Sequence, residues 1–428
     1  MVKKVAIVGA GPCGVLLAHY LLQREDKYQV DIFDFRSDPR IIAFAKTRTF
    51  PITLSERGMS ALRQISGLEA AVKAISLVVK GGVFHESNGK VRVINRKYPL
   101  WSLDRTNLVI TLLTELTRKF AENRVNIYFN YQCTKVDFVN QQITFKTPDS
   151  ATEVDFNYDL LIGADGSRSV VRESFFNTDN FECEQQYTPN DYKSIFLPTP
   201  NPQLGWQKGK VHSWRQDDGT TILLVYQLDA SMSGVVLFPH DKNSITELTT
   251  QAAVRDYFQH NFPEIGQIMP DAEAEEFAKR TAARVLTIRC DRYHQNDSVL
   301  LMGDAAHAVS PSLGQGCNAA LEDVLIFQQI LDEYHDNLAL ALAQFTIRRQ
   351  ADAHALVELS NYGVPTSRKL FLELLLRNSL SKFLHPIWPR FFLPSLFELT
   401  AENKLSYSAI FDLYQDWIAK VKRVIGNG

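Results

Sequence analysis

Three acidic residues follow short apolar segments of the chain and stand beside glycines. Asp34 ends the segment "VDIFD", Asp165 lies in "LLIGADGS", and Asp304 lies in "VLLMGDAA". In an open α/β sheet, ligands bind outside the carboxyl ends of the strands, where a carboxylate accepts hydrogen bonds from sugar or polyol hydroxyls. Glycines at the same places let a ligand approach the backbone. The three segments therefore predict a site for an extended cofactor that carries sugar hydroxyls.

The segment "GAGPCG" follows a strand of four apolar residues and precedes a predicted helix. Gly9 permits a tight turn, Gly11 lets a pyrophosphate approach the backbone, and Gly14 lets helix and strand pack closely. The free N–H groups at the start of the helix bind phosphate. Asp34 lies twenty residues after Gly14, where an acidic side chain bonds to a ribose. The pattern predicts a dinucleotide site, and a glycine-rich structural turn is the alternative.

The stretch from Ser298 to Val324 joins Asp304 to a loop of small residues and to a predicted helix from about Asn318. The loop residues 314–316 leave room for a flat group against the backbone. A helix N-terminus carries about half a positive charge, which stabilises the anionic pyrimidine edge of a reduced flavin. The stretch therefore predicts a seat for a flavin ring and its ribityl chain. His307 beside it is expected to be a hydrogen-bonded structural residue and not a catalyst.

Two residues of these motifs keep two interpretations each. Arg36 either lies by the adenosine of the dinucleotide or is an exposed surface charge. Asp165 either binds the cofactor at the strand edge or caps a helix in an ordinary turn. No side-chain nucleophile, catalytic triad or metal cluster is recognised in the sequence. The predicted chemistry therefore belongs to the bound flavin.

The composition is that of an ordinary globular protein. The chain has 428 residues, of which 45% are hydrophobic and 22% charged, with a formal net charge of −2. This near-neutral balance gives no reason to expect a nucleic-acid partner. The five cysteines form no CxxC pair and no metal-ligand spacing, which predicts reduced thiols, no metal site and a cytoplasmic location. The sequence has no uncharged apolar window of about 18 residues, so no transmembrane helix is predicted.

The segment 383–400 is rich in aromatic residues and proline. It is either a packed C-terminal element or a patch that touches a membrane or a partner. Membrane association through this region is therefore left open and is not predicted. The oligomeric state is not predicted either.

Hydrophobic patterning predicts an α/β fold. Continuous apolar runs are typical of buried parallel strands, whereas the alternating strands between 182 and 284 favour an antiparallel sheet with a helix near 244–260. After residue 318 the pattern is mostly helical. We expect a Rossmann-like FAD-binding domain, an inserted, largely antiparallel β-sheet substrate domain and a C-terminal helical region. The expected FAD-binding parts are 1–75, 101–181 and 285–345, the substrate-domain parts are 76–100 and 182–284, and the helical region is 346–428.

These signals, in this order, resemble the FAD-dependent aromatic hydroxylases, which are single-component flavoprotein monooxygenases. The resemblance is most specific to the kynurenine monooxygenases, and it covers nearly the whole chain, including the C-terminal helical region. The segments that carry it are "RTFPITLSERGMSALRQISGLEAAV" (48–72), "LDRTNLVITLL" (103–113), "QQYTPNDYKSIFLP" (185–198), residues 303–323 and "LFELTAENKLSYSAIFDLYQDW" (396–417).

By position, the resemblance implies which residues contact the cofactors. Asp165 belongs to a motif that in the family serves both FAD and NADPH or NADH. Residues implied to contact FAD are Gly9, Gly11, Gly14, Asp34, Arg36, Arg105 and Asp304. Residues implied to approach the flavin ring are Leu54, Gly314, Gln315, Gly316, Cys317 and Asn318.

The chain departs from the family at the expected substrate site. Gly82 stands where the family has an arginine for the substrate's carboxylate, and Lys80 nearby is not equivalent to a fork-shaped guanidinium. The family's C-terminal asparagine is replaced by Gly363, whereas its tyrosine is kept as Tyr407. The aromatic pair that follows Pro311 in the family is Ser312 and Leu313 here. The residues expected by position to bind substrate are Lys80, Gly82, Pro311, Leu313, Gly363 and Tyr407.

The resemblance implies an NADPH- or NADH-dependent enzyme in which a flavin hydroperoxide, formed with O₂, hydroxylates an aromatic ring. The expected substrate is a kynurenine-like or other tryptophan-derived or phenolic small molecule. Losing a buried carboxylate anchor would cost about 2–5 kcal/mol, so kynurenine itself is not expected. One alternative is an FAD-binding protein that does not hydroxylate. Another is a flavin enzyme of a different type, an epoxidase or a halogenase, although the halogenase motif Trp-x-Trp-x-Ile-Pro does not occur in the sequence.

Overall fold

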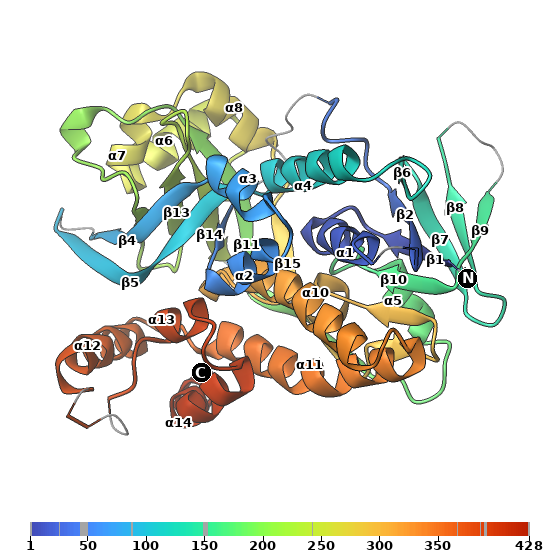
Figure 1. Ribbon diagram of the computed structural model, residues 1–428. Coiled ribbons are helices and arrows are strands. Elements are labelled where there is room, and N and C mark those ends of the chain that lie inside the picture. The colour runs from blue at the N-terminus through green and yellow to red at the C-terminus, as the bar shows by residue number, and fades with distance from the viewer. Residues whose placement is uncertain are drawn as a thin grey trace.

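The computed structural model describes residues 2–24, 26–42, 50–86, 89–148, 153–241, 243–365, 367–385, 387–388 and 392–426. These residues form a six-stranded, an eight-stranded and a three-stranded sheet, with helices packed around them (Figure 1). Residues 48 and 49 of the segment 48–72, and residues 386 and 389–391 of the segment 383–400, lie outside the described residues.

A parallel sheet supports the N-terminal motif. Its strand order is β16-β17-β10-β1-β2-β6, and all neighbouring pairs except β16–β17 are parallel. The carboxyl ends of β2, β1, β10 and β17 therefore meet at one edge of the sheet. The strands are β1 (Lys3–Val8), β2 (Tyr28–Asp34), β6 (Val125–Phe129), β10 (Leu160–Gly163), β16 (His294–Gln295) and β17 (Val299–Leu301).

The central strands are apolar throughout because elements cover both faces of this sheet. All four residues of β10 and all three of β17 are buried. Helix α1 contacts both α4 and α10, and its residues from Cys13 to Leu22 are all buried. The elements around the sheet are α1 (Pro12–Leu22), α4 (Arg105–Lys119), α5 (Val170–Phe175), α9 (Asp304–His307), α10 (Gly316–Glu333) and the small antiparallel sheet of β7 (Gln132–Asp137), β8 (Gln142–Lys146) and β9 (Val154–Asn157).

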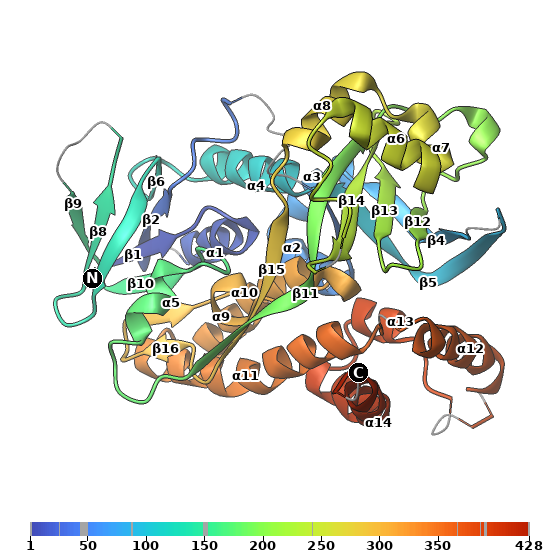
Figure 2. The ribbon, with the colours of Figure 1, turned by 180° about the vertical axis from the view of Figure 1, so that it is seen from behind.

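The second large sheet has the strand order β15-β11-β14-β13-β12-β4-β5-β3 and is antiparallel except where β12 meets β4. Strands β11 and β15 pair with each other and reach toward the first sheet (Figure 2). Strand β15 continues to Cys290, six residues beyond the expected boundary at 284. The strands are β3 (Pro51–Leu54), β4 (Leu77–His85), β5 (Val91–Asp104), β11 (Cys183–Leu197), β12 (Val211–Arg215), β13 (Thr221–Tyr226), β14 (Met232–Pro239) and β15 (Ala283–Cys290).

Three helices cover one face of the second sheet, where a single helix near 244–260 was expected (Figure 1). They are α6 (Gln251–Asn261), α7 (Pro263–Ile268) and α8 (Asp271–Lys279). Pro263 is the first residue of α7, and Pro270 immediately precedes α8. Proline lacks a backbone N–H and starts helices more readily than it continues them, so the two prolines divide this segment. Phe258 of α6 and Phe277 of α8 pack with buried sheet residues in one core.

The chain after β17 is mostly helical, as expected, and its last helices, α12, α13 and α14, lie beneath the second sheet in the view of Figure 1. Leu356, Leu374, Leu396 and Tyr407 share one hydrophobic cluster, so four helices pack together there. The helices are α11 (Leu338–Tyr362), α12 (Arg368–Leu384), α13 (Leu396–Ala401) and α14 (Tyr407–Gly426), and short helices elsewhere are α2 (Glu56–Arg63) and α3 (Leu68–Ala74).

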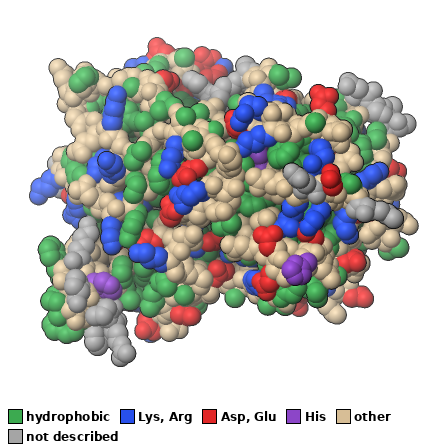
Figure 3. All heavy atoms as spheres, in the orientation of Figure 1, with side chains coloured by type: hydrophobic (Ala, Val, Ile, Leu, Met, Phe, Trp, Pro, Cys, Tyr) green, Lys and Arg blue, Asp and Glu red, His purple; other side chains and the backbone are tan. Residues whose placement is uncertain are grey.

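Helix α12 packs through one face only. Leu370 and Leu374 are buried, whereas large apolar side chains on another face are exposed, and hydrophobic atoms gather at the lower left of Figure 3 where α12 lies. The segment 383–400 thus divides into a packed part at Leu396 and an exposed part. Among the described residues no helix is both long enough and apolar enough to cross a membrane. The exposed apolar residues are Leu372, Leu376, Leu380, Phe383, Ile387 and Trp388.

Candidate functional site

Of the three glycines after β1, Gly9 and Gly14 are closely surrounded by other atoms, whereas Gly11 faces open space. Gly9 has φ +110°, and a Cβ there would lie 2.3 Å from the oxygen of Ala164. A Cβ at Gly14 would lie 2.2 Å from the oxygen of Gly9, so both positions need glycine for packing. Around Gly11, in contrast, a Cβ would meet nothing within 4 Å. Helix α1 starts there without a side-chain cap or an acidic residue in its first turn, which leaves its N–H groups available to an anion.

Asp34 lies at the end of β2, and its carboxylate already accepts four hydrogen bonds. Its Oδ2 accepts from the N–H of Ala10 (2.9 Å) and from Nη2 of Arg36 (2.8 Å), and its Oδ1 accepts from the backbone N and from Nε of Arg36 (both 2.9 Å). This pairing raises the pKa of Arg36. A carboxylate has about four acceptor positions, so a ribose hydroxyl would bond to Asp34 only if Arg36 moved away. Arg36 is therefore a partly exposed cation (40% of its side chain) that is paired with Asp34.

Asp165 follows β10 and caps the short helix α5. Its Oδ2 accepts from the N–H groups of Val170 (2.8 Å) and Val171 (3.3 Å). Its Oδ1 is buried and has no hydrogen-bond partner among the described residues. Burial raises the pKa of Asp165, because the hydrogen bonds do not compensate fully for lost water. The two interpretations of Asp165 are thus compatible. Its Oδ2 caps the helix, and its Oδ1 could accept a hydrogen bond from a ligand.

Asp304 follows β17 and faces the loop before α10. A Cβ added to Gly316 would lie 4.0 Å from its Oδ1, and the backbone N–H groups that begin α10 have no side-chain cap. Cys317 nearby is half-buried, and desolvation raises the pKa of its thiol to about 12, although the charge of Arg105 lowers it in part. The charges of Arg105 and Asp304 therefore both act on the first turn of α10. The described residues donate no hydrogen bond to the Asp304 carboxylate that would compete with a ligand.

Asn318 holds the loop in place through its side-chain amide. Its Oδ1 accepts from the N–H of Ser55 (2.8 Å), and its Nδ2 donates to the oxygens of Thr53 (2.9 Å) and Gly314 (3.0 Å). The side chain is fully buried. It thereby fixes the end of β3, which carries the buried Leu54, against the turn before α10. The expected approach of Asn318 to a flavin stays a prediction.

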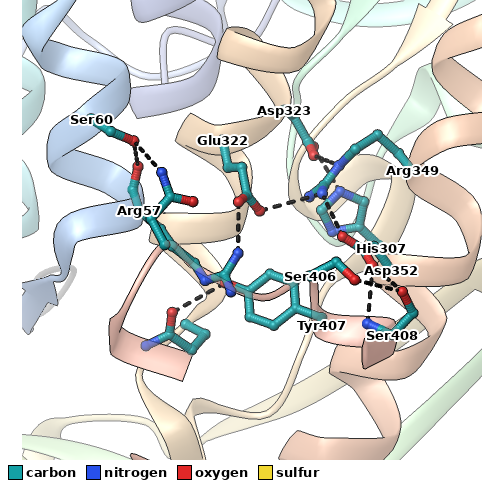
Figure 4. Close-up of polar contacts among 12 residues, drawn as sticks. Arg57, Ser60, His307, Glu322, Asp323, Arg349, Asp352, Ser406, Tyr407 and Ser408 are labelled. Carbon is teal, nitrogen blue, oxygen red and sulfur yellow. Dashed lines mark hydrogen bonds and ion pairs between the residues drawn. The ribbon is translucent and has the colours of Figure 1, made fainter. Parts of the chain in front are cut away.

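Gln315 connects this loop to the C-terminal helices. Its Oε1 accepts a hydrogen bond from the hydroxyl of Tyr407 (3.1 Å). The guanidinium of Arg57 lies 4.2 Å from the centre of the Tyr407 ring, in a cation–π contact. Arg57 also donates to Glu322 of α10 (2.7 Å) and to the oxygen of Thr400 (3.1 Å), as Figure 4 shows for Glu322. Helices α2, α10 and α14 are therefore tied together at the loop.

A buried ionic cluster continues from there along α10. Arg349 donates from Nε to Asp323 (2.8 Å) and from Nη1 to Glu322 (3.3 Å). Asp323 in turn bonds to His307 (2.6 Å) and accepts from the N–H of Gly303 (2.9 Å) (Figure 4). Burial alone would raise the pKa of Asp323, but His307 and Arg349 hold it below its ordinary value. His307 is thus a hydrogen-bonded structural residue, as expected. The cluster itself was not predicted, because charges so far apart in sequence show no local pattern.

The residues expected to bind substrate differ in their burial and in their neighbours. Gly82 lies in β4, where a Cβ would make ordinary van der Waals contact with the Val211 oxygen (3.4 Å) and with Phe84 (3.6 Å). The side chain of Lys80 is exposed. Pro311 is exposed too, whereas Leu313 is buried in the C-terminal cluster.

Gly363 is enclosed by the C-terminal helices. A Cβ there would lie 2.4 Å from both the Leu359 oxygen and Leu396 Cδ2, and the Gly363 oxygen accepts from Trp417 Nε1 (3.1 Å). Its position serves helix packing, so we leave Gly363 out of the substrate site. Tyr407 is fully buried and uses its hydroxyl on Gln315.

Comparison with known families decides which cofactor fits this edge. A family described as "FAD binding domain" matches residues 3–360. The chain belongs to this family. It is 30% identical to kynurenine 3-monooxygenase of Sus scrofa over 97% of this chain and 87% of that protein. It is 31% identical to kynurenine 3-monooxygenase 3 of Aspergillus niger over 98% of this chain and 90% of that protein.

The fold is shared with solved structures of low sequence identity. A tetrameric form of 2-methyl-3-hydroxypyridine-5-carboxylic acid oxygenase superposes with a TM-score of 0.69 at 20% identity, over 89% of this chain and 93% of that chain. Together with the family match, these similarities confirm a mixed α/β FAD-binding fold and an FAD-dependent monooxygenase close to the kynurenine monooxygenases.

The cytoplasmic location expected from the cysteines is contradicted by these comparisons. The animal kynurenine 3-monooxygenases to which the chain is similar are known as mitochondrial outer-membrane enzymes. Unpaired cysteines indicate reduced surroundings, and this condition does not identify one compartment. The cysteine pattern therefore assigns no location to this chain.

Proposed function

We propose that this FAD-dependent monooxygenase hydroxylates an aromatic small molecule with NADPH or NADH as reductant and O₂ as oxidant. The substrate class is kynurenine-like or another tryptophan-derived or phenolic compound. In the balanced reaction, NAD(P)H, a proton, O₂ and an aromatic C–H give NAD(P)⁺, water and a phenolic C–OH. The kynurenine 3-monooxygenases similar to this chain carry the relevant activity in their names.

One structural relationship carries the proposal. The strands β2, β1, β10 and β17 are parallel neighbours, and a glycine or a carboxylate of the predicted motifs stands at the end of each strand or within three residues after it. The residues at these ends fit FAD. The open space at Gly11 and the free start of α1 suit a pyrophosphate, and the unpartnered Oδ1 of Asp165 suits a hydrogen-bond donor.

The proposed roles of the residues follow from these positions. Gly9 and Gly14 shape the turn and Gly11 receives the pyrophosphate, while Asp34 and Arg36 lie where the adenosine ribose would bind. Asp304 and Arg105 flank the ribityl chain and ring. The bound FAD supplies the redox chemistry, carrying electrons from the nicotinamide to O₂ and an oxygen atom to the substrate.

The loop before α10 is proposed to hold the flavin ring. Gly314, Gln315 and Gly316 leave room for a flat group, and the uncapped start of α10 favours negative charge on the ring. Leu54, Cys317 and Asn318 are assigned the role of keeping this loop in place. The substrate would lie between this loop, the second sheet and the C-terminal helices, where the buried surroundings exclude water. We retain the expected division into domains as part of this proposal, with the second sheet as the substrate domain.

Turnover with a compound panel tests the proposal. The FAD-loaded chain is mixed with NADPH or NADH and with tryptophan-pathway and phenolic compounds, and products are identified by mass spectrometry. We expect at least one compound to accelerate nicotinamide oxidation and to gain one oxygen atom. FAD binding without any stimulated oxidation or product would support an FAD-binding protein instead.

A further inference from the structure

Two cysteines face each other at one end of the paired strands β11 and β15. Cys183 begins β11 and Cys290 ends β15, and the two residues are directly opposite partners in the antiparallel pair. Their Sγ atoms lie 3.1 Å apart. Cys290 is fully buried in the hydrophobic core of the parallel sheet, and Cys183, which is partly exposed, packs against that core. One thiol of the pair is therefore open to a small reagent and the other is shielded from it.

The backbone holds the two cysteines in the geometry that a disulfide needs. Directly opposite residues of antiparallel strands have Cα atoms about 4.5–5.5 Å apart, which lies inside the range of about 4.4–6.8 Å found in disulfides. Just beyond the pair, the N–H of Asp291 donates to the oxygen of Glu182 (2.9 Å), and the N–H of Glu182 donates to Oδ1 of Asp291 (3.1 Å). Because these bonds fix the strand ends, rotation of the two side chains is enough to bring the sulfurs to bonding distance.

The surroundings favour a thiolate on Cys183 and a thiol on Cys290. The hydrogen bond from the Cys290 thiol lowers the pKa of Cys183, and the positive charge of Arg172 lowers it further. The same hydrogen bond, together with burial, raises the pKa of Cys290. Arg172 is held in place by donating to the oxygens of Ala305 (3.0 Å) and Ser167 (2.8 Å). The thiolate is the nucleophilic form of cysteine, so Cys183 is the more reactive of the two residues.

The other three cysteines have surroundings that suppress reactivity. Burial raises the pKa of Cys13, of Cys133 and of Cys317, and it brings the pKa of Cys133 to about 12. Their thiols are therefore protonated near pH 7, and protonated thiols react slowly with oxidants. These cysteines serve as references inside the same molecule.

We propose that Cys183 and Cys290 are a site of oxidation, at which a small hydroperoxide converts the two thiols into a disulfide. In the first step the Cys183 sulfur attacks an oxygen of hydrogen peroxide, the O–O bond breaks, and the leaving hydroxide takes up a proton to become water. In the second step the Cys290 sulfur attacks the sulfenic sulfur of Cys183, the S–O bond breaks, and the Cys290 proton leaves with that hydroxide as a second water. The two sulfurs together lose two electrons, and the peroxide gains them. This inference goes beyond the proposed hydroxylation and does not depend on it.

The disulfide would fasten β11 to β15 inside the core of the parallel sheet. Both strands belong to the second sheet and reach toward the first (Figure 2), so the bond would join the elements that connect the two sheets. The two cysteines are 107 residues apart in the sequence. A cross-link between such distant residues restricts the unfolded chain, so the oxidised protein should resist unfolding better than the reduced protein.

Thiol counting and peptide mapping test the inference. The FAD-loaded protein is treated with hydrogen peroxide, its free thiols are counted after denaturation, and its cross-linked peptides are identified by mass spectrometry. We expect wild-type protein to lose two of its five thiols, to show a single linkage between Cys183 and Cys290, and to recover all five thiols with dithiothreitol. Retention of all five thiols, or a linkage between other cysteines, would overturn the inference.

Three variants separate the roles of the two thiols. Cys290→Ala should accumulate a sulfenic acid at Cys183 that dimedone traps, because the second thiol is missing. Cys183→Ser should lose thiols at least about tenfold more slowly than wild type, because the more reactive sulfur is missing. Cys133→Ser is the matched control and should form the linkage as wild type does. Equal rates of thiol loss in Cys183→Ser and Cys133→Ser would contradict the assignment of Cys183 as the attacking residue.

Thermal melting tests the structural consequence of the bond. Oxidation should raise the melting temperature of wild-type protein and of Cys133→Ser by about 3 °C or more, and it should leave that of Cys290→Ala unchanged. A disulfide between Cys183 and Cys290 that raises no melting temperature would overturn its role in fastening the two strands.

Discussion

The hydroxyl of Tyr407 donates a hydrogen bond to Oε1 of Gln315 at 3.1 Å, so the first residue of helix α14 touches the residue that precedes α10. Both side chains are buried. The C-terminal helices therefore do more than cover the molecule, since they fix the loop that we propose to hold the flavin ring. Substitutions in α14 should consequently alter the spectrum or the binding of the flavin.

Tyr407→Phe should perturb the flavin loop while keeping the ring that Arg57 contacts. The buried Oε1 of Gln315 would lose its donor, which costs about 1–2 kcal/mol. We expect a changed visible spectrum of bound FAD and weaker FAD binding. The control is Tyr414→Phe, which removes a hydrogen bond to the oxygen of Pro394 (2.6 Å) from the same helix. If both variants alter the flavin spectrum equally, the contact with Gln315 has no special role.

Gly11→Ala and Gly9→Ala should fail in different ways. A Cβ at Gly11 meets nothing within 4 Å, so the apoprotein should fold normally, but the methyl group would occupy the place of the pyrophosphate. We expect unchanged circular dichroism and melting of the apoprotein with FAD affinity lowered at least about tenfold. Gly9→Ala places a Cβ 2.3 Å from the Ala164 oxygen at φ +110° and should impair folding itself. Full FAD affinity in Gly11→Ala would contradict the proposed position of the pyrophosphate.

Asp165→Asn should separate stability from cofactor binding. Burial raises the pKa of Asp165, so the folded state binds this proton more tightly than the unfolded state does. The resulting contribution to the free energy of unfolding is largest below the ordinary carboxyl pKa of about 4 and is lost as the pH rises through the folded pKa.

The substitution removes this dependence and keeps a helix-capping side chain. Near pH 7 the Asp165→Asn apoprotein should therefore be at least as stable as wild type, with the difference shrinking toward about pH 4. Its rate of nicotinamide oxidation with FAD should fall. Denaturant unfolding at several pH values measures the first effect, and a less stable variant near pH 7 would contradict this reading of Asp165.

Arg349→Met should destabilise the molecule strongly. It would leave Asp323, Glu322 and Asp352 without their shared cation in a buried cluster, which costs about 3–5 kcal/mol. The neighbouring Arg348→Met is the control, because Arg348 pairs with Glu333 at the surface (2.8 Å) and such pairs contribute about 1 kcal/mol or less. Thermal melting of the two variants should differ clearly, and equal melting temperatures would show that the cluster contributes little.

Local sequence patterns predicted the parallel-sheet half of the fold in detail. Strand β10 coincides with the apolar run that precedes Asp165, and helix α1 follows the segment "GAGPCG" as predicted, because an apolar run that ends in glycine and a helix with Pro12 in its first turn are governed by neighbouring residues. Prediction was weaker where prolines divide a helical segment, as at Pro263 and Pro270. A period of apolar residues does not by itself show where a helix is interrupted.

The candidate site was predicted in its motifs and not in its long-range partners. Gly11, Asp165 and Asp304 were recognised because each follows a strand directly. The pairing of Asp34 with Arg36 was missed, since it depends on which donors and acceptors surround a side chain in three dimensions.

A crystal structure of the chain grown with FAD tests the central claim most directly. The account predicts the pyrophosphate over Gly11 at the start of α1, the ribityl chain beside Asp304, and the flavin ring against residues 314–316. FAD bound elsewhere, or a fully soaked crystal with this edge of the parallel sheet empty, would contradict it.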